Sequence, residues 1–296
     1  MASADDFDDH VESTEVPGQQ SISHYPPSDR PNACTYRLRE DSNTDLIINP
    51  TVTELMSPKK PKQPKPTPSR TDQPTKQTIF AGRDGLAAYT TDPASFPASR
   101  VVYYNDKFVV IKDLFPKATV HLLLLPRDTS KSVLRGQEAF DDPVFLEECR
   151  KELGKVKEMA GSELRRKLGK HSVKEAPRLA ALRSDDPPDV LPPGRDWTAD
   201  LITGTHANPS MNHLHIHVLS KDMVSECMKK SNHYLSFTTD FLIGLDEYPL
   251  AEQDHRRSYK HFPGDMVCWR CGKNFGNKMA RLREHLEEEL VEWREQ

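Results

Sequence analysis

The sequence predicts an α+β fold, an antiparallel sheet with covering helices, followed by a small zinc-finger domain. Three observations carry this prediction: short β-branched runs joined by a tight turn, a long segment with helical periodicity, and a Cys-x-x-Cys pair followed by a histidine. Strands joined by short turns pair antiparallel, whereas a parallel sheet needs a crossover between neighbouring strands. We therefore expect a main domain over residues 78–250 and a finger over residues 251–296.

Residues 1–77 are predicted to be a disordered tail. The chain has 24 prolines against 13 glycines, and this stretch is rich in proline, poor in aromatic residues and without periodicity. Such a composition buries too little apolar surface to offset the chain entropy lost on folding. Within the tail, the lysine- and proline-rich run Pro58–Lys65 resembles a nuclear import signal. A solvated linker is an equal alternative for this run.

The first ordered elements are predicted to be a short helix and a hairpin. The helix is expected over Gly85–Thr91, with Pro93 as its stop signal. Val101–Tyr104 and Phe108–Lys112 are rich in β-branched and aromatic residues, and three turn-forming residues separate them. This pattern is typical of two strands joined by a hairpin turn.

A buried strand and a long helix come next. His121–Pro126 is an almost continuous apolar run that ends at a proline. Asp142 and Pro143 then combine a helix cap with proline at the first helical position. The helix is predicted because apolar residues follow at spacings of three and four: Phe145, Cys149, Leu153, Val156, Ala160, Leu164 and Leu168. Residues 170–195 are proline-rich and are expected to form a surface insertion, and Leu201–Thr205 is expected to be a further strand.

The distribution of charge is more informative than the net charge of −4. Between residues 256 and 283, eight lysines and arginines accompany a single acidic residue, Asp265. Such a segment is suited to binding phosphates. No run of 18 apolar residues occurs, so neither a membrane span nor a membrane partner is expected.

A stretch with three alternating histidines carries the strongest chemical signal. Residues two apart on a strand share a face, so a strand over His213–Leu219 would present His213, His215 and His217 on one side. Imidazole can act as a nucleophile, a proton donor or a phosphate ligand near neutral pH. A metal site and a coincidental surface row are the alternatives. Imidazoles in a row do not converge on one point as zinc ligands do, which favours phosphate chemistry.

These histidines resemble the motif of the histidine-triad family of nucleotide hydrolases and transferases. The upstream segment Asp113–Pro126 resembles the nucleotide pocket of that family. The resemblance implies the histidine-triad fold. It also implies that His215 attacks the α-phosphorus of a nucleotide and forms a covalent nucleotidyl-histidine. His217, better as an imidazolium, would hold a phosphate oxygen, and His213 would support the geometry of the others.

The same resemblance assigns residues to a nucleotide pocket. Asp113 matches the acid that binds the ribose hydroxyls. Ile111 and Leu114 match positions that line the base pocket, and His121 lies beside the phosphate region. For Ile111, Leu114 and His121, plain core packing is an equal alternative.

A second constellation near the C-terminus predicts a structural zinc site. Cys268 and Cys271 form a knuckle that can place both thiolates on one ion. His285 lies on a predicted helix over residues 277–293, and Glu289 is one turn later on the same face. We therefore expect two cysteines, one histidine and Glu289 as the zinc ligands, with Glu288 as the alternative fourth ligand. A Cys-x-x-Cys pair without metal is the alternative to the whole site.

The order of a histidine triad and a zinc finger resembles the aprataxin family of DNA-repair deadenylases, and the glutamate ligand resembles its fungal members. The resemblance implies removal of AMP from 5′-adenylated DNA nicks or ends, the products of abortive ligation, through an adenylyl-histidine. His206 matches the residue that protonates the DNA leaving group, and Lys117 and Ser210 match phosphate contacts. Because His215 must be neutral and His217 is better charged, activity is expected to peak at mid pH.

The resemblance also implies contacts with DNA. Leu86 and Tyr89 lie where the family stacks a helix on the terminal base pair, with core packing as the alternative. Basic residues in and before the finger are expected to contact DNA phosphates: Lys221, Lys273, Lys278 and Arg281. Through the tail, the protein is expected to bind DNA-repair proteins, and its expected location is the nucleus.

Two functions of other classes remain as alternatives. A hydrolase of small nucleoside phosphoramidates or dinucleotides needs only the triad, and the basic segment with the finger argues against it. A non-catalytic zinc-finger binder of nucleic acid needs no triad, and the complete set of histidines with His206 argues against it.

Overall fold

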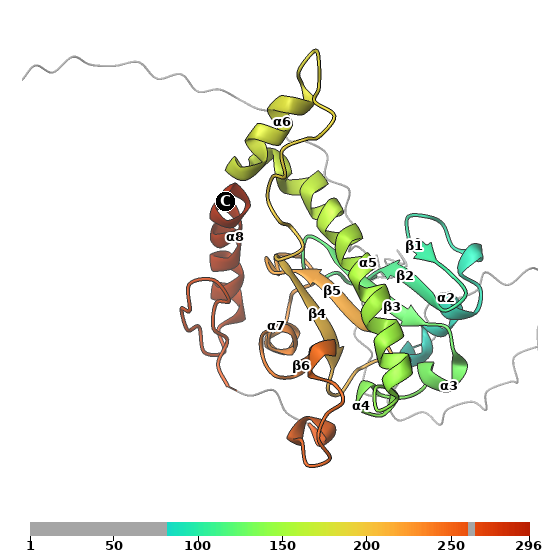
Figure 1. The fold of residues 1–296 in the computed structure, drawn as a ribbon. Helices are drawn as coiled ribbons and strands as arrows, with labels where there is room; N and C mark the ends of the chain where they lie inside the picture. The colour runs from blue at the N-terminus through green and yellow to red at the C-terminus, as the bar shows by residue number, and fades with distance from the viewer. Residues whose placement is uncertain (1–81, 260–263) are drawn as a thin grey trace, which may run out of the picture. The chain divides into compact units, whose positions relative to one another are not determined.

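The computed structural model describes residues 82–259 and 264–296 (Figure 1). The predicted disordered tail over 1–77, with its run Pro58–Lys65, lies outside the described residues. Within the two described ranges, no helix combines the length and the apolar character that crossing a membrane requires.

Six strands in the described part of the chain form one antiparallel sheet, in the order β1-β2-β3-β5-β4-β6. Their bounds are β1 Val101–Tyr104, β2 Phe108–Lys112, β3 His121–Pro126, β4 Leu201–His206, β5 Ile216–Ser220 and β6 Leu242–Ile243. The predicted hairpin is formed by β1 and β2, and the predicted buried strand is β3. The expectation of an α+β fold with an antiparallel sheet is confirmed.

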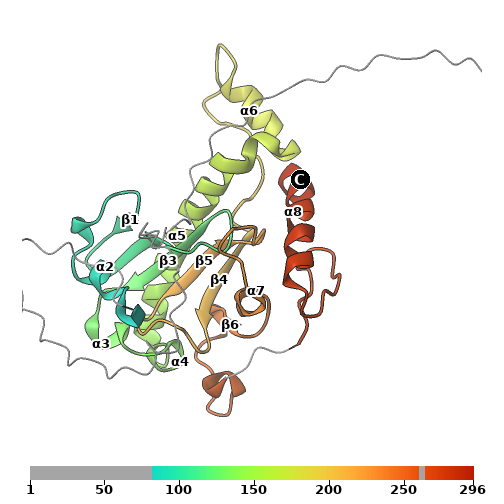
Figure 2. The same cartoon turned by 180° about the vertical axis from the view of Figure 1, so that it is seen from behind.

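One long helix crosses a face of this sheet, and shorter helices lie beside the sheet or beyond its end (Figures 1 and 2). The helices are α2 Ala87–Thr91, α3 Thr129–Ser132, α4 Gly136–Ala139, α5 Pro143–Leu168, α6 Ala176–Leu182, α7 Ser231–Thr238 and α8 Met279–Glu295. The long helix α5 begins as predicted, because the Asp142 side chain accepts from the backbone N–H groups of Val144 and Phe145 at 2.9 and 3.2 Å. This cap satisfies two donors that the first turn leaves unpaired.

The alternation of side chains along the strands gives the sheet two different faces. On one face, Val110, Leu124 and Val218 are fully buried in the same apolar cluster as the inner side of α5. On the other face, Ile111 and Leu123 pack in a separate cluster with residues of α2. His217 lies opposite Leu123 in the register of β3 and β5. The candidate site residue His217 therefore lies on the sheet face away from α5.

The expected surface insertion, residues 170–195, is only partly a surface feature. It contains α6, and Pro177 occupies one of the first two positions of that helix, where proline is tolerated. Val190 at its tip is 85% exposed, but Glu175 and Arg195 near its base are 1% and 5% exposed. The prediction of a surface loop is wrong for the base, because these two charged side chains have buried partners.

Within the finger predicted over 251–296, residues 264–296 form a knuckle closed by a β-bridge between Val267 and Asn274, followed by α8. The predicted helix over 277–293 corresponds to α8. Leu282 and Leu286 on its inner face share one apolar cluster with Tyr234 of α7. The Tyr234 hydroxyl also donates to the backbone oxygen of Val267 at 2.9 Å. The finger thus packs directly on the domain that contains the histidines.

Candidate active site and metal centre

A cavity of about 360 Å³ opens on the sheet face away from α5. This volume lies in the range of pockets that hold small molecules and cofactors. Eleven of the predicted site residues line this cavity: Leu86, Tyr89, Ile111, Asp113, Leu114, Lys117, His121, His206, Ser210, His215 and His217. His213 and Lys221 are not among its lining residues.

His215 is held in one tautomer by the backbone. Its Nδ1 lies 2.6 Å from the carbonyl oxygen of His213. A carbonyl only accepts, so we assign the ring proton to Nδ1, which leaves a lone pair on Nε2. Burial lowers the pKa of His215 below its ordinary value. The ring is therefore neutral near pH 7, the form that a nucleophile needs.

The predicted strand His213–Leu219 is too long at its start. Strand β5 begins at Ile216, because the backbone N–H of Leu214 donates to the carbonyl oxygen of Ser132 at 2.7 Å rather than joining the sheet. The half-buried His213 side chain lies outside the cavity lining, and its carbonyl positions His215. The prediction that three rings share one strand face is wrong for His213.

A chain of hydrogen bonds sets the tautomers of two further histidines. The backbone N–H of Lys117 donates to His121 Nδ1 at 3.1 Å, so the ring proton of His121 is on Nε2. His121 Nε2 then donates to His217 Nδ1 at 2.9 Å. His217 consequently carries its proton on Nε2, a buried atom without a partner in the protein. An acceptor such as a phosphate oxygen would satisfy it.

Burial keeps this histidine cluster neutral. Desolvation lowers the pKa of His121 to about 4 and that of His206 to about 3. It also lowers the pKa of His217 well below the ordinary value. The expectation of an imidazolium at His217 is therefore wrong for the unliganded protein. A neutral ring with its proton on Nε2 still donates a hydrogen bond to an anion.

Asp113 supplies the negative charge at the cavity. Burial would raise the pKa of Asp113, but His121, Lys117 and the backbone N–H of Phe115 more than reverse this and lower it. The Phe115 N–H donates to Asp113 Oδ1 at 2.7 Å. The second oxygen, Oδ2, lies 3.6 Å from His121 Nε2. The ionised carboxylate is available to accept hydrogen bonds from hydroxyl groups in the cavity.

One wall of the cavity is apolar. Leu86 and Tyr89 are 7% and 3% exposed and pack with Ile111 and Leu123. Their burial favours the core-packing alternative, and stacking of Leu86 and Tyr89 on DNA stays a prediction. Ser210 is exposed at the cavity, and its phosphate contact likewise stays a prediction.

Helix α7 contributes cavity residues that the sequence did not reveal. Asn232, His233, Ser236 and Phe237 line the cavity together with the histidines. The Phe237 ring stands edge-on to His217, with ring centroids 5.1 Å apart. No local pattern marks these residues, because tertiary packing alone brings α7 to the sheet.

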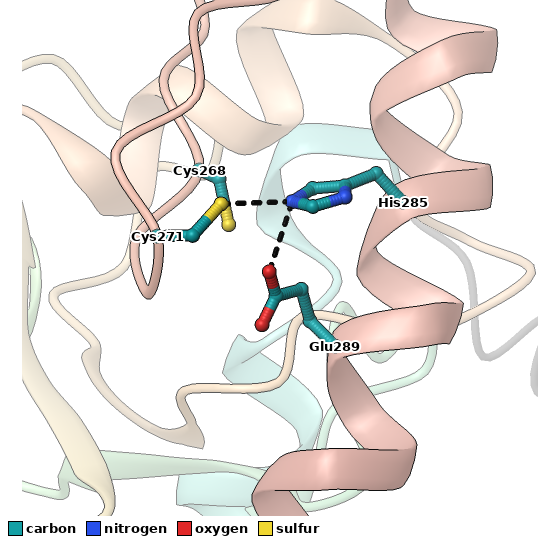
Figure 3. Close-up of side chains that lie close together, drawn as sticks. All are labelled: Cys268, Cys271, His285 and Glu289. Carbon is teal, nitrogen blue, oxygen red and sulfur yellow. Dashed lines mark hydrogen bonds and ion pairs between the residues drawn. The ribbon is translucent and has the colours of Figure 1, made fainter. Parts of the chain in front are cut away.

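The four predicted zinc ligands meet in the finger (Figure 3). His285 Nε2 lies 3.1 Å from Cys271 Sγ and 3.1 Å from Glu289 Oε1. The donor atoms of these residues and of Cys268 all lie within 4.8 Å of one another. With metal–ligand bonds of about 2.0–2.3 Å, such a set fits around one tetrahedral zinc ion. Glu288, the alternative ligand, is not part of this cluster.

Glu289 is oriented by an arginine from the knuckle. Arg270 forms an ion pair with Glu289 Oε2 and a second one with Glu292 Oε2 at 2.8 Å. The pairing with Arg270 lowers the pKa of Glu289. One carboxylate oxygen therefore faces Arg270 while the other faces His285, as expected of an oriented metal ligand.

The predicted DNA-binding residues of the finger lie together. Lys273, Lys278 and Arg281 line a hollow beside the zinc ligands, with Asn277 among them. Lys221 is separate and donates to the carbonyl oxygen of Ala199 at 2.7 Å.

Asp113, His121 and His217 form a second group of side chains whose ligand atoms lie within 4.8 Å of one another. In the described structure, the facing nitrogens of His121 and His217 share a hydrogen bond.

Comparison with known proteins supports this picture. Residues 97–224 match the model of the HIT domain, and residues 238–292 match that of the C2HE / C2H2 / C2HC zinc-binding finger. An aprataxin-like protein of Schizosaccharomyces pombe is 32% identical over 228 residues, covering 75% of this chain and 87% of the relative. An aprataxin-like protein of Saccharomyces cerevisiae is 32% identical, covering 70% of this chain and 95% of the relative.

The chain belongs to the aprataxin-like proteins.

Solved structures agree with this assignment. A structure described as Hnt3 in complex with DNA and guanosine superposes with a TM-score of 0.57 at 31% identity, covering 71% of this chain and 96% of that one. The aprataxin ortholog Hnt3 from Schizosaccharomyces pombe gives a TM-score of 0.56 at 30% identity, covering 71% and 94%. The predicted histidine-triad fold with a C-terminal zinc finger is confirmed. This aprataxin-like chain is a histidine-triad hydrolase with a zinc-binding finger.

Proposed function

We propose that the protein is a DNA-repair hydrolase that removes AMP from 5′-adenylated nicks or ends, through a covalent adenylyl-histidine. The observation that carries the proposal is the pair of fixed tautomers in the cavity. His215 Nε2 has a free lone pair, and His217 Nε2–H is a buried donor without a partner. Hnt3, a relative of this chain, is described in complex with DNA and guanosine.

The reaction begins with attack of His215 Nε2 on the α-phosphorus of the adenylate. A phosphorus–nitrogen bond forms, and the bond from the α-phosphorus to the oxygen of the DNA 5′-phosphate breaks. His217 donates from Nε2 to a non-bridging oxygen, where negative charge accumulates. Asp113 accepts from the ribose hydroxyls and Lys117 contacts phosphate. Water then cleaves the phosphorus–nitrogen bond, which releases AMP and regenerates neutral His215.

His206 supplies the proton to the DNA leaving group. Its Nε2 is buried, has no partner in the protein and faces the same cavity as His215. Burial lowers the pKa of the free ring to about 3. The phosphates of a bound substrate raise that pKa, because an adjacent negative charge favours the protonated form.

The finger holds the duplex while the cavity takes its adenylated end. Lys273, Lys278 and Arg281 neutralise DNA phosphates, a contact that needs no base reading. Zinc held by Cys268, Cys271, His285 and Glu289 is structural and fixes the knuckle to α8. The protein works in the nucleus and contacts other DNA-repair proteins through its tail.

Turnover of adenylated nicked DNA tests the function. We expect release of AMP and of a 5′-phosphorylated strand, at a higher kcat/KM than for a small adenosine phosphoramidate. His215→Ala should abolish turnover and leave DNA binding intact. Preference for the phosphoramidate would favour the small-molecule hydrolase, and turnover of neither substrate would favour the non-catalytic binder.

A further inference from the structure

The chain has three tryptophans, and all of them lie where the end of α8 meets the main domain. Trp293 of α8 stands edge-on to Trp197, with ring centroids 6.3 Å apart, and edge-on to Trp269 at 6.1 Å. Trp269 lies in the knuckle between the two cysteine ligands. This cluster joins the metal site to the main domain through side chains that the proposed chemistry does not use.

Arg195 lies against two of the three tryptophan rings, Trp197 and Trp293. Its guanidinium carbon lies 4.2 Å from the ring centroid of Trp197 and 5.0 Å from that of Trp293. One terminal nitrogen donates to the Trp293 carbonyl oxygen at 2.7 Å, and the other contacts Asp200 Oδ2 at 2.7 Å. The Trp293 indole N–H completes the ring by donating to Asp200 Oδ1 at 3.2 Å. We call Arg195, Trp197, Asp200 and Trp293 the clasp.

Residues at the base of the insertion hold the clasp in place through hydrogen bonds and an ion pair. Glu175 Oε1 accepts from the Trp197 indole N–H at 2.8 Å and from the Arg195 backbone N–H at 3.0 Å. Arg165 of α5 pairs with the same oxygen at 2.9 Å and donates to the Arg195 carbonyl at 3.0 Å. A buried charge is tolerated only when it is paired in this way. Contacts within the main domain therefore hold Arg195 in place in addition to its contact with α8.

The clasp is also continuous with the active site. Asp200 directly precedes β4, which runs from Leu201 to His206. Its backbone oxygen accepts from the Lys221 N–H at 3.0 Å, which extends the pairing of β4 and β5. At the other end of this strand, His206 faces the cavity. One short strand therefore spans the distance between the docking point of the finger and the cavity.

We propose that Arg195 is a positioning residue that selects for DNA. By clasping Trp293, it holds the finger at one orientation to the cavity, so that a single duplex reaches both. A small adenylate touches only the cavity and does not depend on the clasp. The inference rests on the proposed function and adds to it the element that makes the protein act on a polymer rather than on a free nucleotide.

The test compares two substrates in matched variants of the full chain. In Arg195→Gln, kcat/KM for adenylated nicked DNA should fall about tenfold, mainly through KM, because the finger no longer presents the duplex to the cavity. The value for an adenosine phosphoramidate should stay unchanged. Arg178→Gln is the control, because Arg178 lies in the same insertion and donates to the Pro192 carbonyl oxygen at 3.0 Å, outside the clasp. It should change neither substrate.

A second variant separates loss of the clasp contacts from a general loss of structure. Arg195→Lys keeps a positive charge beside Asp200, but one ammonium cannot replace the planar fork that reaches both Asp200 and the Trp293 carbonyl. It should show the same loss on DNA alone. Equal losses on both substrates in both variants would mean a merely structural role and overturn the proposal. An unchanged kcat/KM on DNA would overturn it as well.

Tryptophan fluorescence gives a readout independent of turnover. Because all three tryptophans lie at this contact, the emission of Arg195→Gln should shift to longer wavelength as the C-terminal end of α8 separates from the main domain, and that of Arg178→Gln should not. An unshifted emission contradicts the proposal. If the wild-type protein failed to act on adenylated DNA, the proposed function would fall, and the affinity of Arg195→Gln for nicked DNA relative to wild type would then decide the role of the clasp.

Discussion

The roles of the histidines are decided by which backbone group each ring meets. His215 Nδ1 faces a carbonyl and becomes the donor, whereas His121 Nδ1 faces an N–H and becomes the acceptor. The spacing of the motif identified His215 and His217 as neighbours at one site. It could not reveal the tautomers or the lowered pKa values, because both arise from loops and burial that no local pattern encodes.

The pKa of His215 sets the pH dependence of turnover. Attack needs the neutral ring, and kcat/KM reports the ionisation of the free enzyme. Because burial lowers the pKa of His215, the loss of kcat/KM that protonation of this ring causes should begin only below the ordinary histidine value of about 6.5. The measurement is a pH profile of kcat/KM on adenylated DNA. A decline centred at or above that ordinary value would contradict the described burial.

Elements with a local signature were predictable, and elements positioned by distant contacts were not. The α5 cap and the β1–β2 hairpin are each determined by a few neighbouring residues, and both form as predicted. The start of β5 was misplaced because Leu214 bonds to Ser132, far away in sequence. The contribution of α7 to the cavity and the buried base of the insertion depend in the same way on tertiary partners.

Within α8, the spacing of four residues between His285 and Glu289 predicts that both side chains bind the same zinc ion. Glu289→Ala should lose its zinc on dialysis, because only three of the four protein ligands remain. Glu289→His should retain zinc, since imidazole is an ordinary fourth ligand. Zinc content per chain measures both variants. Glu288→Ala is the matched control and should keep its metal; full zinc in Glu289→Ala would assign the fourth ligand elsewhere.

For the molecule as a whole, the buried neutral histidines couple folding to pH. In the unfolded chain these rings have pKa values near 6.5, whereas the folded protein lowers the pKa of His121 to about 4. Between these values the unfolded state binds the extra proton, so acidification favours unfolding. Stability contributed by the neutral ring is present above the unfolded pKa and is lost as the pH falls toward the folded one.

His121→Gln tests this coupling, because glutamine keeps an N–H donor in place of Nε2 but does not titrate. From about pH 6.5 down to pH 4, the free energy of unfolding of the wild type should fall more steeply than that of the variant, by up to about 1.4 kcal/mol per pH unit. Urea unfolding at several pH values measures both slopes. Parallel slopes would show that His121 is not neutral in the folded protein.

The carbonyl of His213 has one more consequence, for the regiochemistry of the trapped intermediate. Since that oxygen engages Nδ1 of His215, adenylylation of the imidazole can occur only at the distal nitrogen. Quenching the enzyme during turnover should yield a single phosphoramidate isomer, linked through Nε2.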